Sequence, residues 1–389
     1  MNIVSVVSSR LAKDRGCIDT PSYVYFPEIL DVNYASLKEC LGTNLIVSIK
    51  ANSNVDLLSL SVVDKDGYEG TSLEELKIIT QLGAKEKFIN NPSMDQGLLR
   101  KSILSGATVI VDNLNQIEFL KNIKEDMDIP PVMLRVNPKA LSTYYKCLDT
   151  TKGDHFGMSV EDIDIAIDRL KEMKISILGL HIFKGSHSFK KSAFETLDLI
   201  KLLSEHCENK LGYSLSKLNF GGGFSSDWSV SGFDYESYRN KLKSFFSGYD
   251  LYHEAGRALF EAAGIYVTKV ISTKTLGASD IAICDGGLAH NFLLAQTEST
   301  FKKFRKPSFV VSAGKRATHG ECTIVGSSCN KDDVVGKIPE GEANPSVDDL
   351  IIFDRCGAYN QVYSPINFLS LKKAASYLMF LDKSEIVSE

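Results

Sequence analysis

The sequence predicts an α/β plus all-β chain in which a (β/α)8 TIM barrel is followed by a C-terminal β domain. Short runs rich in Val, Ile and Leu alternate with longer amphipathic stretches, the pattern of parallel strands joined by helices. Eight such runs precede residue 264, and eight units in about 250 residues are typical of this barrel. Beyond that point, β-rich segments follow one another without helices. We therefore assign residues 24–264 to the barrel, and residues 1–23 and 265–389 to a domain resembling a β-sandwich or barrel.

The predicted elements are short strands separated by helices. In chain order, the barrel strands are Leu45–Ile49, Gly67–Gly70, Lys87–Asn90, Thr108–Val111, Val132–Val136, Ile175–Ile182, Leu218–Phe220 and Tyr249–His253. Between them, apolar residues recur at helical spacing in Asp31–Leu41, Ser72–Leu82, Asn115–Lys124, Val160–Met173 and Ala193–Cys207. Strands of the second domain are predicted at Tyr266–Ser272, Ile281–Cys284, Ser308–Ser312, Glu321–Val325 and Asp349–Asp354.

The ends of the predicted barrel strands carry residues that can do chemistry. In TIM barrels the active site lies at the C-terminal ends of the strands. The residues at those ends here are Lys50, Glu69, Asn90, Asp112, Arg135, His181, Gly221 and Glu254. The sequence therefore predicts an active site at this end of the barrel.

Lys50 is the first candidate catalytic residue because it directly follows an apolar strand. Partial burial disfavours the ammonium and lowers its pKa, which suits an amine that must be neutral to form a Schiff base. A lysine whose chain lies along apolar surface and whose ammonium reaches water is the structural alternative. Further residues are needed to decide between them.

A phosphate site is predicted after the seventh and eighth strands. Gly221, Gly222 and Gly223 follow the seventh strand, and backbone N–H groups of such a run can point at an anion. Alone, a glycine run is more often a tight turn. The next strand leads into Glu254-Ala-Gly256-Arg257, in which the arginine offers paired donors to phosphate.

These features together fit pyridoxal 5′-phosphate (PLP). Its aldehyde would be on Lys50 and its phosphate at the glycines. Glu254 would keep the pyridine nitrogen protonated, so that the ring can accept electrons from a broken bond at Cα. An ion pair with Arg257 is the alternative role for Glu254.

Composition excludes several other classes. The formal net charge of −5 provides no basic field for nucleic acid or anionic lipid. No apolar stretch approaches the roughly 20 residues of a membrane span, and no signal peptide is evident, so a cytoplasmic protein is expected. The eight cysteines include no CxxC and the seven histidines no HExxH, which predicts reduced thiols and no metal site.

The ordered motifs resemble the fold-type III PLP-dependent decarboxylases, which include ornithine, diaminopimelate, biosynthetic arginine and carboxynorspermidine decarboxylases. The resemblance extends along nearly the whole chain. Its motifs are Ser48-Ile-Lys50-Ala-Asn52, Glu69-Gly-Thr-Ser72-Leu-Glu-Glu75, Asn91-Pro92, Leu134-Arg135-Val-Asn-Pro138, Phe156-Gly157, Gly179-Leu-His181, Gly185-Ser186, Gly221-Gly-Gly223, Glu254-x-Gly256-Arg257, Asp285-Gly-Gly, Gly326-x-x-Cys329-x-x-x-Asp333 and Gly357-Ala-Tyr359. It implies an alanine racemase-like barrel whose β domain contributes to the active sites of a homodimer.

The resemblance also implies roles for individual residues. Cys329, with Asp333, would reach the neighbouring subunit's site and return a proton to Cα after carbon dioxide leaves. The implied cofactor-binding residues are Lys50, Glu69, Arg135, His181, Phe183, Ser186, Gly221, Gly222, Gly223, Glu254, Gly256, Arg257 and Tyr359. The implied substrate-binding residues are His155, Asn330, Asp333 and Tyr359.

Three positions depart from the family pattern. Phe183 replaces a histidine that often stacks on the pyridine ring, and His155 replaces a lysine. Asn330 replaces an acid next to the catalytic cysteine, which weakens the case for a substrate with a distal cation. The stretches 181–187 and 363–370 resemble a biosynthetic branch that acts on carrier-bound amino acids or siderophore intermediates.

The leading hypothesis is therefore a PLP-dependent decarboxylase of an amino acid or an amino-acid conjugate. An amino-acid racemase is the nearest alternative, but it needs two bases on opposite faces of Cα, and the Cys329 motif argues against it. A non-catalytic PLP carrier or regulator is the alternative from another class. Retention of Lys50, Glu254, Arg257 and Cys329 together argues against that.

Overall fold

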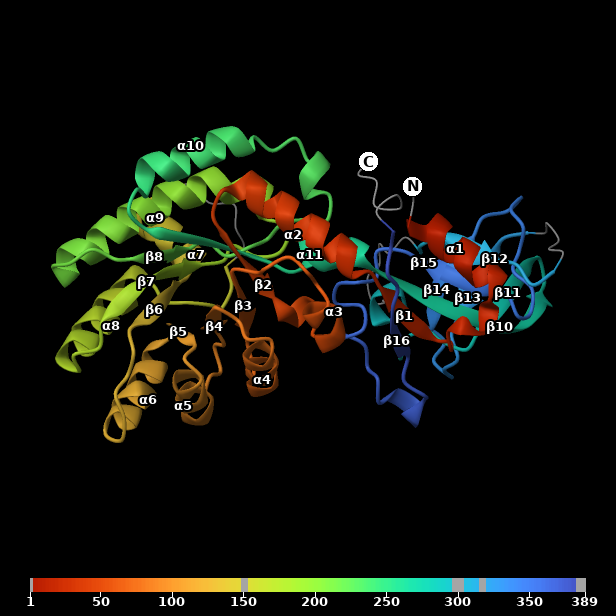
Figure 1. Cartoon of the computed structure of the whole chain (residues 1–389), viewed down its shortest axis with the longest axis horizontal. Coiled ribbons are helices and arrows are strands. Elements are labelled where there is room, and N and C mark those ends of the chain that lie inside the picture. The colour runs from red at the N-terminus through yellow and green to blue at the C-terminus, as the bar shows by residue number, and fades with distance from the viewer. Residues whose placement is uncertain (1–2, 148–152, 296–303, 315–319, 383–389) are drawn as a thin grey trace. The chain divides into compact units, whose positions relative to one another are not determined.

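A computed structural model of the chain describes residues 3–147, 153–295, 304–314 and 320–382 (Figure 1). The described residues divide into two compact units. One unit comprises those of Asn33–Val55 and Val63–Ala258, and the other those of Met1–Val32, Asp56–Val62 and Leu259–Glu389. The first unit contains a barrel and the second a curled sheet.

The first unit is a closed barrel of parallel strands, as the sequence predicts. Its strands are β2 Asn44–Ser48, β3 Gly67–Gly70, β4 Glu86–Ile89, β5 Thr108–Val111, β6 Val132–Val136, β7 Ile177–Ile182, β8 Lys217–Asn219 and β9 Asp250–Ala255. Each strand pairs with the next, and β9 pairs with β2 to close the ring. The predicted fold class is confirmed, and every predicted barrel strand overlaps an observed one.

Helices alternate with these strands along the chain. They are α2 Pro27–Leu41, α3 Val55–Ser59, α4 Leu73–Gln81, α5 Gln96–Leu104, α6 Leu114–Lys124, α7 Pro138–Tyr144, α8 Val160–Glu172, α9 Phe189–Leu211, α10 Tyr235–Phe245 and α11 Arg257–Phe260. Several begin at a side chain that caps a free backbone N–H, such as Ser72, Asp95 and Ser159. Figure 1 shows α4, α5, α6 and α8 around the outside of the strands.

The prediction for the end of the first barrel strand is wrong in one detail. We expected the strand to continue to Ile49 and to deliver Lys50 directly. Strand β2 instead ends at Ser48, and Ile49–Ala51 form a 3-10 turn, η2, that places Lys50. The turn is closed by a hydrogen bond from Asn52 N to Ile49 O (3.0 Å), which ends the extended backbone early.

The interior of the barrel is filled by large side chains. Ile46, Phe88, Ile110, Met133 and Tyr252 form one buried cluster drawn from five of the strands. The interior of this barrel is therefore a packed core, as is usual for TIM barrels. This packing leaves the strand ends as the place for polar side chains.

The second unit is built on a mixed sheet. Its strands are β1 Ser22–Tyr25, β10 Gly264–Leu276, β11 Ser279–Cys284, β12 Phe309–Val311, β13 Cys322–Val325, β14 Val334–Ile338, β15 Leu350–Phe353 and β16 Ala375–Leu378. The pairing order is β12-β15-β10-β11-β13-β14, and β1 pairs with both β10 and β16. The five predicted strands of this domain form, whereas β1, β14 and β16 were not predicted.

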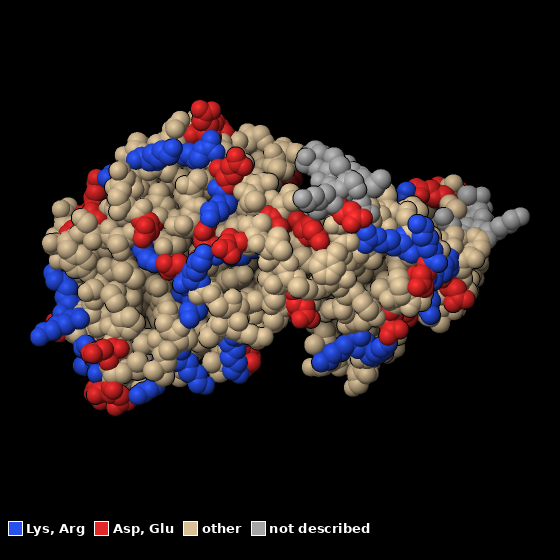
Figure 2. Space-filling model, viewed as in Figure 1, with Lys and Arg blue, Asp and Glu red and all other residues tan. Residues whose placement is uncertain are grey.

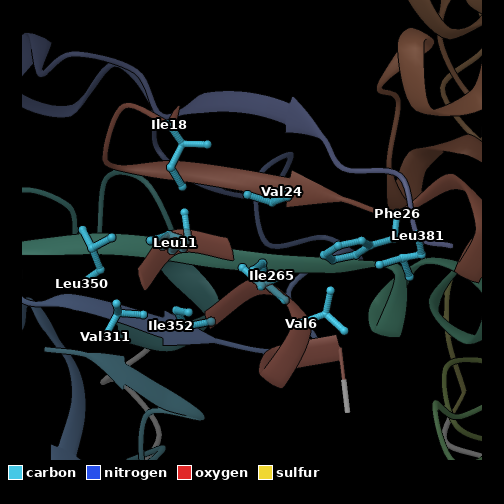
Figure 3. Close-up of a cluster of buried hydrophobic side chains, with 12 residues drawn as sticks. Val6, Leu11, Ile18, Val24, Phe26, Ile265, Val311, Leu350, Ile352 and Leu381 are labelled. Atoms are coloured by element: carbon cyan, nitrogen blue, oxygen red, sulfur yellow. The ribbon is translucent and has the colours of Figure 1, made fainter. Parts of the chain in front are cut away.

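A buried cluster joins the N-terminal helix α1, Ile3–Lys13, to this sheet (Figure 3). The helix contributes Val6, Val7 and Leu11, and Val24 of β1 packs in the same cluster. Residues Val311, Leu350 and Ile352 enter from β12 and β15. The shorter elements of the described chain are η1 Arg15–Cys17, η3 Trp228–Val230, η4 Glu261–Ala263, α12 Phe292–Ala295 and η5 Phe368–Ser370.

Charges are mixed over the face of the molecule drawn in Figure 2, where Lys and Arg side chains alternate with Asp and Glu. Within the described residues, no helix has the length and apolar character needed to span a membrane.

Candidate active site

Lys50 lies at the rim of the barrel and is paired with Glu69. Its Nζ atom is 3.1 and 3.0 Å from the two carboxylate oxygens of Glu69. The side chain of Glu69 is 2% exposed, whereas that of Lys50 is 40% exposed. Burial raises the pKa of the Glu69 carboxyl; the Lys50 ammonium opposes this rise and the Glu254 carboxylate adds to it.

Glu254 is the second buried acid of the rim, near the end of β9. Burial alone would raise its pKa, but the His181 ring, the Lys50 ammonium and the Asn219 amide more than offset this and lower the pKa to about 2. Glu254 therefore stays ionised at neutral pH. A permanent buried carboxylate suits the partner of a protonated ring nitrogen.

His181, on β7, has no conventional partner for its ring. Nε2 lies 3.2 Å from Glu254 Oε1, close enough for an electrostatic interaction. Yet within the described part of the chain neither ring nitrogen makes a hydrogen bond, although both are buried. Buried polar atoms without a hydrogen bond are rare in folded proteins, and this pair lies next to the buried acid Glu254.

Asn219, the last residue of β8, links Glu254 to the glycine run. Its Nδ2 donates to Glu254 Oε1 (2.9 Å) and its Oδ1 accepts from Gly221 N (2.9 Å). The residue is 1% exposed. Sequence reasoning missed Asn219 because the predicted strand continued to Phe220; a polar residue directly before Phe-Gly-Gly-Gly was the available signal.

The glycines after β8 are required by close backbone approaches. A Cβ on Gly221 would collide with the carbonyl oxygen of Ile182, and one on Gly222 with that of Glu254. Gly223 has φ of +92°, and a Cβ there would lie 2.6 Å from Gly185 O. Strand β9 and the glycine run are also joined by a hydrogen bond from Glu254 N to Gly221 O (2.8 Å). The run is therefore a tightly packed cradle next to Glu254.

A second charged network lies across the barrel from these loops. Arg135 Nη1 donates to Asp112 Oδ2 (3.0 Å) and to Asn90 Oδ1 (3.2 Å). The guanidinium lies over the Phe156 ring at 4.4 Å, and Asp112 also accepts from Gly157 N (3.1 Å). Asn90 and Asp112 were predicted at the rim without a role, and the structure shows that they hold Arg135 in place.

The remaining predicted residues of this unit occupy the same end of the barrel. His155 is exposed and lines a cavity of about 330 Å³ with Asp112, Gly157 and Met158. Phe183 is half-buried and lies close to Gly221. A Cβ added to Gly221 would be 3.2 Å from both the Cα and the Cβ of Phe183. The others are Ser186, which is exposed, and Gly256 and Arg257, which are half-buried where α11 begins.

The other unit holds the remaining predicted residues. Cys329 is exposed in the loop between β13 and β14. Asp333, which is 3% exposed, accepts from Ser328 N (3.0 Å), Ser328 Oγ (2.6 Å) and Leu288 N (2.6 Å). Asn330 Oδ1 accepts from Asp332 N (2.9 Å). Both side chains thus organise the loop that carries the cysteine.

Two further features concern backbone geometry, one in that loop and one after β15. A Cβ on Gly326 would collide with the Cα of Gly287 and with Asp333 Oδ1, so the two glycine segments touch through their backbones. Tyr359 is half-buried, with φ of +65°.

The barrel residues fit PLP. The cofactor needs an amine for its aldehyde, a carboxylate for its ring nitrogen and a backbone cradle for its phosphate. Lys50, the ionised Glu254 and the glycine run meet these needs at one end of the barrel.

Comparison with known proteins agrees with this chemistry. The family model described as "Pyridoxal-dependent decarboxylase, pyridoxal binding domain" matches residues 30–261. A diaminopimelate decarboxylase of Deinococcus radiodurans is 29% identical over 277 residues, which are 69% of this chain and 68% of that protein. The L-glutamyl-[BtrI acyl-carrier protein] decarboxylase of Niallia circulans is 25% identical over 399 residues, covering 92% of this chain and 90% of that protein.

Solved structures share the fold. The arginine decarboxylase of Paramecium bursaria Chlorella virus superposes with a TM-score of 0.78 at 19% identity, covering 97% of this chain and all of that one. A lysine/ornithine decarboxylase from Vibrio vulnificus superposes with a TM-score of 0.76 at 19% identity, covering 97% of this chain and 98% of that one. The chain therefore belongs to the pyridoxal-dependent decarboxylases, carboxy-lyases that act on amino acids with PLP as cofactor.

Proposed function

We propose that the protein decarboxylates an amino acid or amino-acid conjugate at a site in which Lys50 holds the cofactor aldehyde and Cys329 of a partner subunit protonates Cα. The observation that supports this best is the convergence of Lys50, ionised Glu254 and the glycine cradle at one end of the barrel. A racemase would share the barrel, the cofactor and the lysine, so the proton donor distinguishes the two reactions.

Each barrel residue has a stated task in this proposal. Bound PLP supplies an electron sink for the bond that breaks at Cα. Glu254 keeps a proton on the ring nitrogen because its own pKa is about 2. Gly221, Gly222 and Gly223, with Arg257, hold the phosphate.

Lys50 and Glu69 act together on the amine. The ion pair, with Nζ to Oε2 at 3.0 Å, keeps the lysine at the rim until the cofactor arrives. Since burial raises the pKa of Glu69, that carboxyl is a fit acceptor for the proton that Lys50 must lose before it can act as a nucleophile.

Cys329 is proposed to deliver the final proton. Carbon dioxide leaves with the electrons of its bond to Cα remaining behind, so Cα must take up one proton to give the amine product. A thiol can supply it and be reprotonated from solvent. The assignment rests on the resemblance of Gly326-x-x-Cys329-x-x-x-Asp333 to the family motif, and it requires a homodimer.

The substrate is proposed to lack a distal cation. Asn330 stands beside Cys329 where an acid would favour a terminal amine, and its Oδ1 already accepts from Asp332 N. The relative from Niallia circulans, which covers 92% of this chain, is by its name a decarboxylase of an L-glutamyl group on an acyl-carrier protein. That relative supports a carrier-bound or otherwise conjugated amino acid, such as an intermediate of siderophore or secondary-metabolite biosynthesis.

Carbon dioxide release tests the reaction and its substrate. The PLP-loaded protein is offered ornithine, lysine, arginine, diaminopimelate, glutamate and a glutamyl acyl-carrier protein, with Lys50→Ala as control. We expect release from the glutamyl carrier protein and none in the control. Release from a free diamino acid alone would contradict the substrate class, and racemisation without release would contradict the reaction.

Mixing two inactive variants tests the shared site. In a heterodimer of Lys50→Ala and Cys329→Ala chains, one site keeps both residues if Cys329 comes from the partner. Random exchange should then restore about a quarter of the wild-type activity, because half of the dimers are mixed and each has one intact site. No recovery above the sum of the separate variants would contradict the partner role of Cys329.

A further inference from the structure

We infer that Asn219 is a positioning residue that sets the spacing between the ring-nitrogen carboxylate and the phosphate cradle. The inference rests on the proposed function, because it assumes that PLP binds between Glu254 and the glycines. It assigns a task to a residue that neither the predicted site nor the family motifs include.

The two hydrogen bonds of Asn219 define the orientation of its amide. The ionised carboxylate of Glu254 can only accept, so the nitrogen faces it at 2.9 Å. The backbone N–H of Gly221 can only donate, so the oxygen faces that group at 2.9 Å. An amide is the side chain of this size that offers a donor and an acceptor in one rigid plane.

Glu254 is therefore tied to Gly221 twice. Its backbone N–H donates to Gly221 O (2.8 Å), and its side chain is linked through Asn219 to Gly221 N. The ring of hydrogen bonds joins one strand end to the loop after its neighbour. Because the distance between the ring nitrogen and the phosphate of the cofactor is fixed, a rigid link between their two binding groups favours the bound geometry before PLP arrives.

The link also selects one oxygen of Glu254. Oε1 accepts from Asn219 and lies 3.2 Å from His181 Nε2. Among the described residues, no side chain or backbone group donates a hydrogen bond to Oε2, so this oxygen is available to a ring N–H. A side chain at position 219 with a different charge should therefore change the electrostatics at the ring nitrogen, not only the stability of the fold.

Two substitutions of Asn219 distinguish the effect of changing its bond to Glu254 from the effect of losing both of its hydrogen bonds. Asn219→Asp keeps an acceptor for Gly221 N but places a second carboxylate next to Glu254, whereas Asn219→Leu removes both bonds. Asn344→Asp is the matched control: Asn344 is also buried, and its Nδ2 donates to the carboxylate of Asp280 (2.8 Å) in the other unit. That control brings two carboxylates together without touching the cofactor residues.

The measurements are the dissociation constant of the apoprotein for PLP, the pH midpoint of the bound-cofactor absorption and the thermal midpoint of the apoprotein. For Asn219→Asp we expect an upward shift of the absorption midpoint by about one pH unit, because added negative charge favours protonated forms. For Asn219→Leu we expect PLP to bind about tenfold more weakly. Asn344→Asp should lower the thermal midpoint and move neither cofactor readout.

The inference is overturned if Asn219→Asp leaves the absorption midpoint in place, if Asn344→Asp moves it equally, or if Asn219→Leu binds PLP within twofold of wild type. Failure of the wild-type protein to bind PLP would instead overturn the proposed function. The two failures are thus distinguishable, since the first is seen only in a wild type that binds PLP.

Discussion

Two lysine–glutamate pairs lie at opposite ends of the same barrel, and their burial is reversed. At the C-terminal ends of the strands, Lys50 is 40% exposed and its partner Glu69 is 2% exposed. At the N-terminal ends, Lys217 is 15% exposed and its partner Glu86 is 35% exposed. Both pairs have N–O distances of about 3 Å, so distance alone does not tell them apart.

The surroundings of the two lysines explain the difference. Lys217 lies over the rings of Phe88 and Tyr252, at 5.8 and 5.2 Å. Burial alone would lower its pKa, but the hydrogen bonds it donates to Glu86 and Tyr252 raise it. Lys217 is therefore held as an ammonium that closes the bottom of the barrel, since β4 and β8 are not neighbours in the ring.

At the other end the acid is the buried member. Glu69 shares its low-dielectric surroundings with Glu254, and its raised pKa makes it able to accept a proton from Lys50. Lys50 itself is reachable from solvent. Under the proposed function, the lysine that reacts has an accessible amine on a buried acid, whereas Lys217 has a buried amine on a more accessible acid.

The largest expected effect follows from removing each lysine in turn. Lys50→Ala should lower carbon dioxide release by at least about 10³-fold, because no other amine replaces the nucleophile, with little change in thermal midpoint. Lys217→Met should keep activity within about threefold and lower the free energy of unfolding by about 1–2 kcal/mol. Steady-state rates and thermal unfolding check both. Comparable losses of activity in the two variants would contradict the distinction between a catalytic Lys50 and a structural Lys217.

The buried acid Glu254 and the more exposed acid Glu86 should also differ in how much their substitution lowers kcat. Glu254→Gln should lower kcat by about 10²-fold or more, because the neutral amide cannot hold a proton on the ring nitrogen. Glu86→Gln is its matched control and should leave kcat within about twofold. The measurement is kcat at saturating PLP, so that weak cofactor binding is not mistaken for slow chemistry. An active Glu254→Gln enzyme would remove the proposed role of this acid.

A smaller effect is expected at the cradle. Gly222→Ala should weaken PLP binding by about tenfold, because its Cβ would collide with the carbonyl oxygen of Glu254 and push the loop away. Gly97→Ala is the control, since it lies in helix α5 and a Cβ there would be 3.4 Å from Asp95 Oδ1, an ordinary contact. Binding is measured by titrating apoprotein with PLP. Unchanged affinity in Gly222→Ala would show that the glycines serve packing alone.

The smallest effect on activity is expected in the barrel wall, where pH changes stability instead. His253 is buried between Thr43 Oγ1 and the Tyr238 hydroxyl, both at 2.8 Å, and burial lowers its pKa to about 3. Between pH 6.5 and 3 the unfolded chain therefore binds the additional proton. The free energy of unfolding should fall by about 1.4 kcal/mol per pH unit as the solution is acidified through this window.

His253→Gln isolates that contribution from the rim acids. Glu254, with its pKa lowered to about 2, adds a loss of stability below about pH 4.5, and the raised pKa of Glu69 acts in the opposite direction. Both terms remain in the variant. Denaturant unfolding at pH 6.5 and 5.0 should therefore show a steeper loss for wild type, and equal slopes would mean that His253 is protonated in the folded state.

The elements that were predictable from sequence are those with a strong local pattern. Most barrel strands were found because they are short apolar runs between amphipathic stretches, whereas Gly67–Gly70 and Lys87–Asn90 are only weakly apolar; Lys50 and Glu254 stand out at strand ends. Helix α1 was missed because Ile3-Val-Ser-Val-Val reads as a strand, although Val4, Val7 and Leu11 are buried at helical spacing. Strand β16 lacks an alternating pattern that would mark it in advance.

The site was predictable only in part for a similar reason. Asn219 acts through groups on two neighbouring strands, and such pairing is visible only after the barrel closes. The buried acceptor role of Asp333 depends on Leu288, which lies far from it in sequence. The role of Cys329 came from the resemblance alone, because an exposed thiol carries no local signal of its task.

The bonding of Asp333 has a consequence for the mobility of the loop that carries Cys329. The Asp333 carboxylate accepts hydrogen bonds from Ser328 N, in the same loop, and from Leu288 N, in a separate segment. The backbones of Gly287 and Gly326, from the same two segments, are in close contact. Ser328 and Asp333, on either side of Cys329, are thus joined directly by hydrogen bonds. These bonds limit how far the sulfur of Cys329 can move.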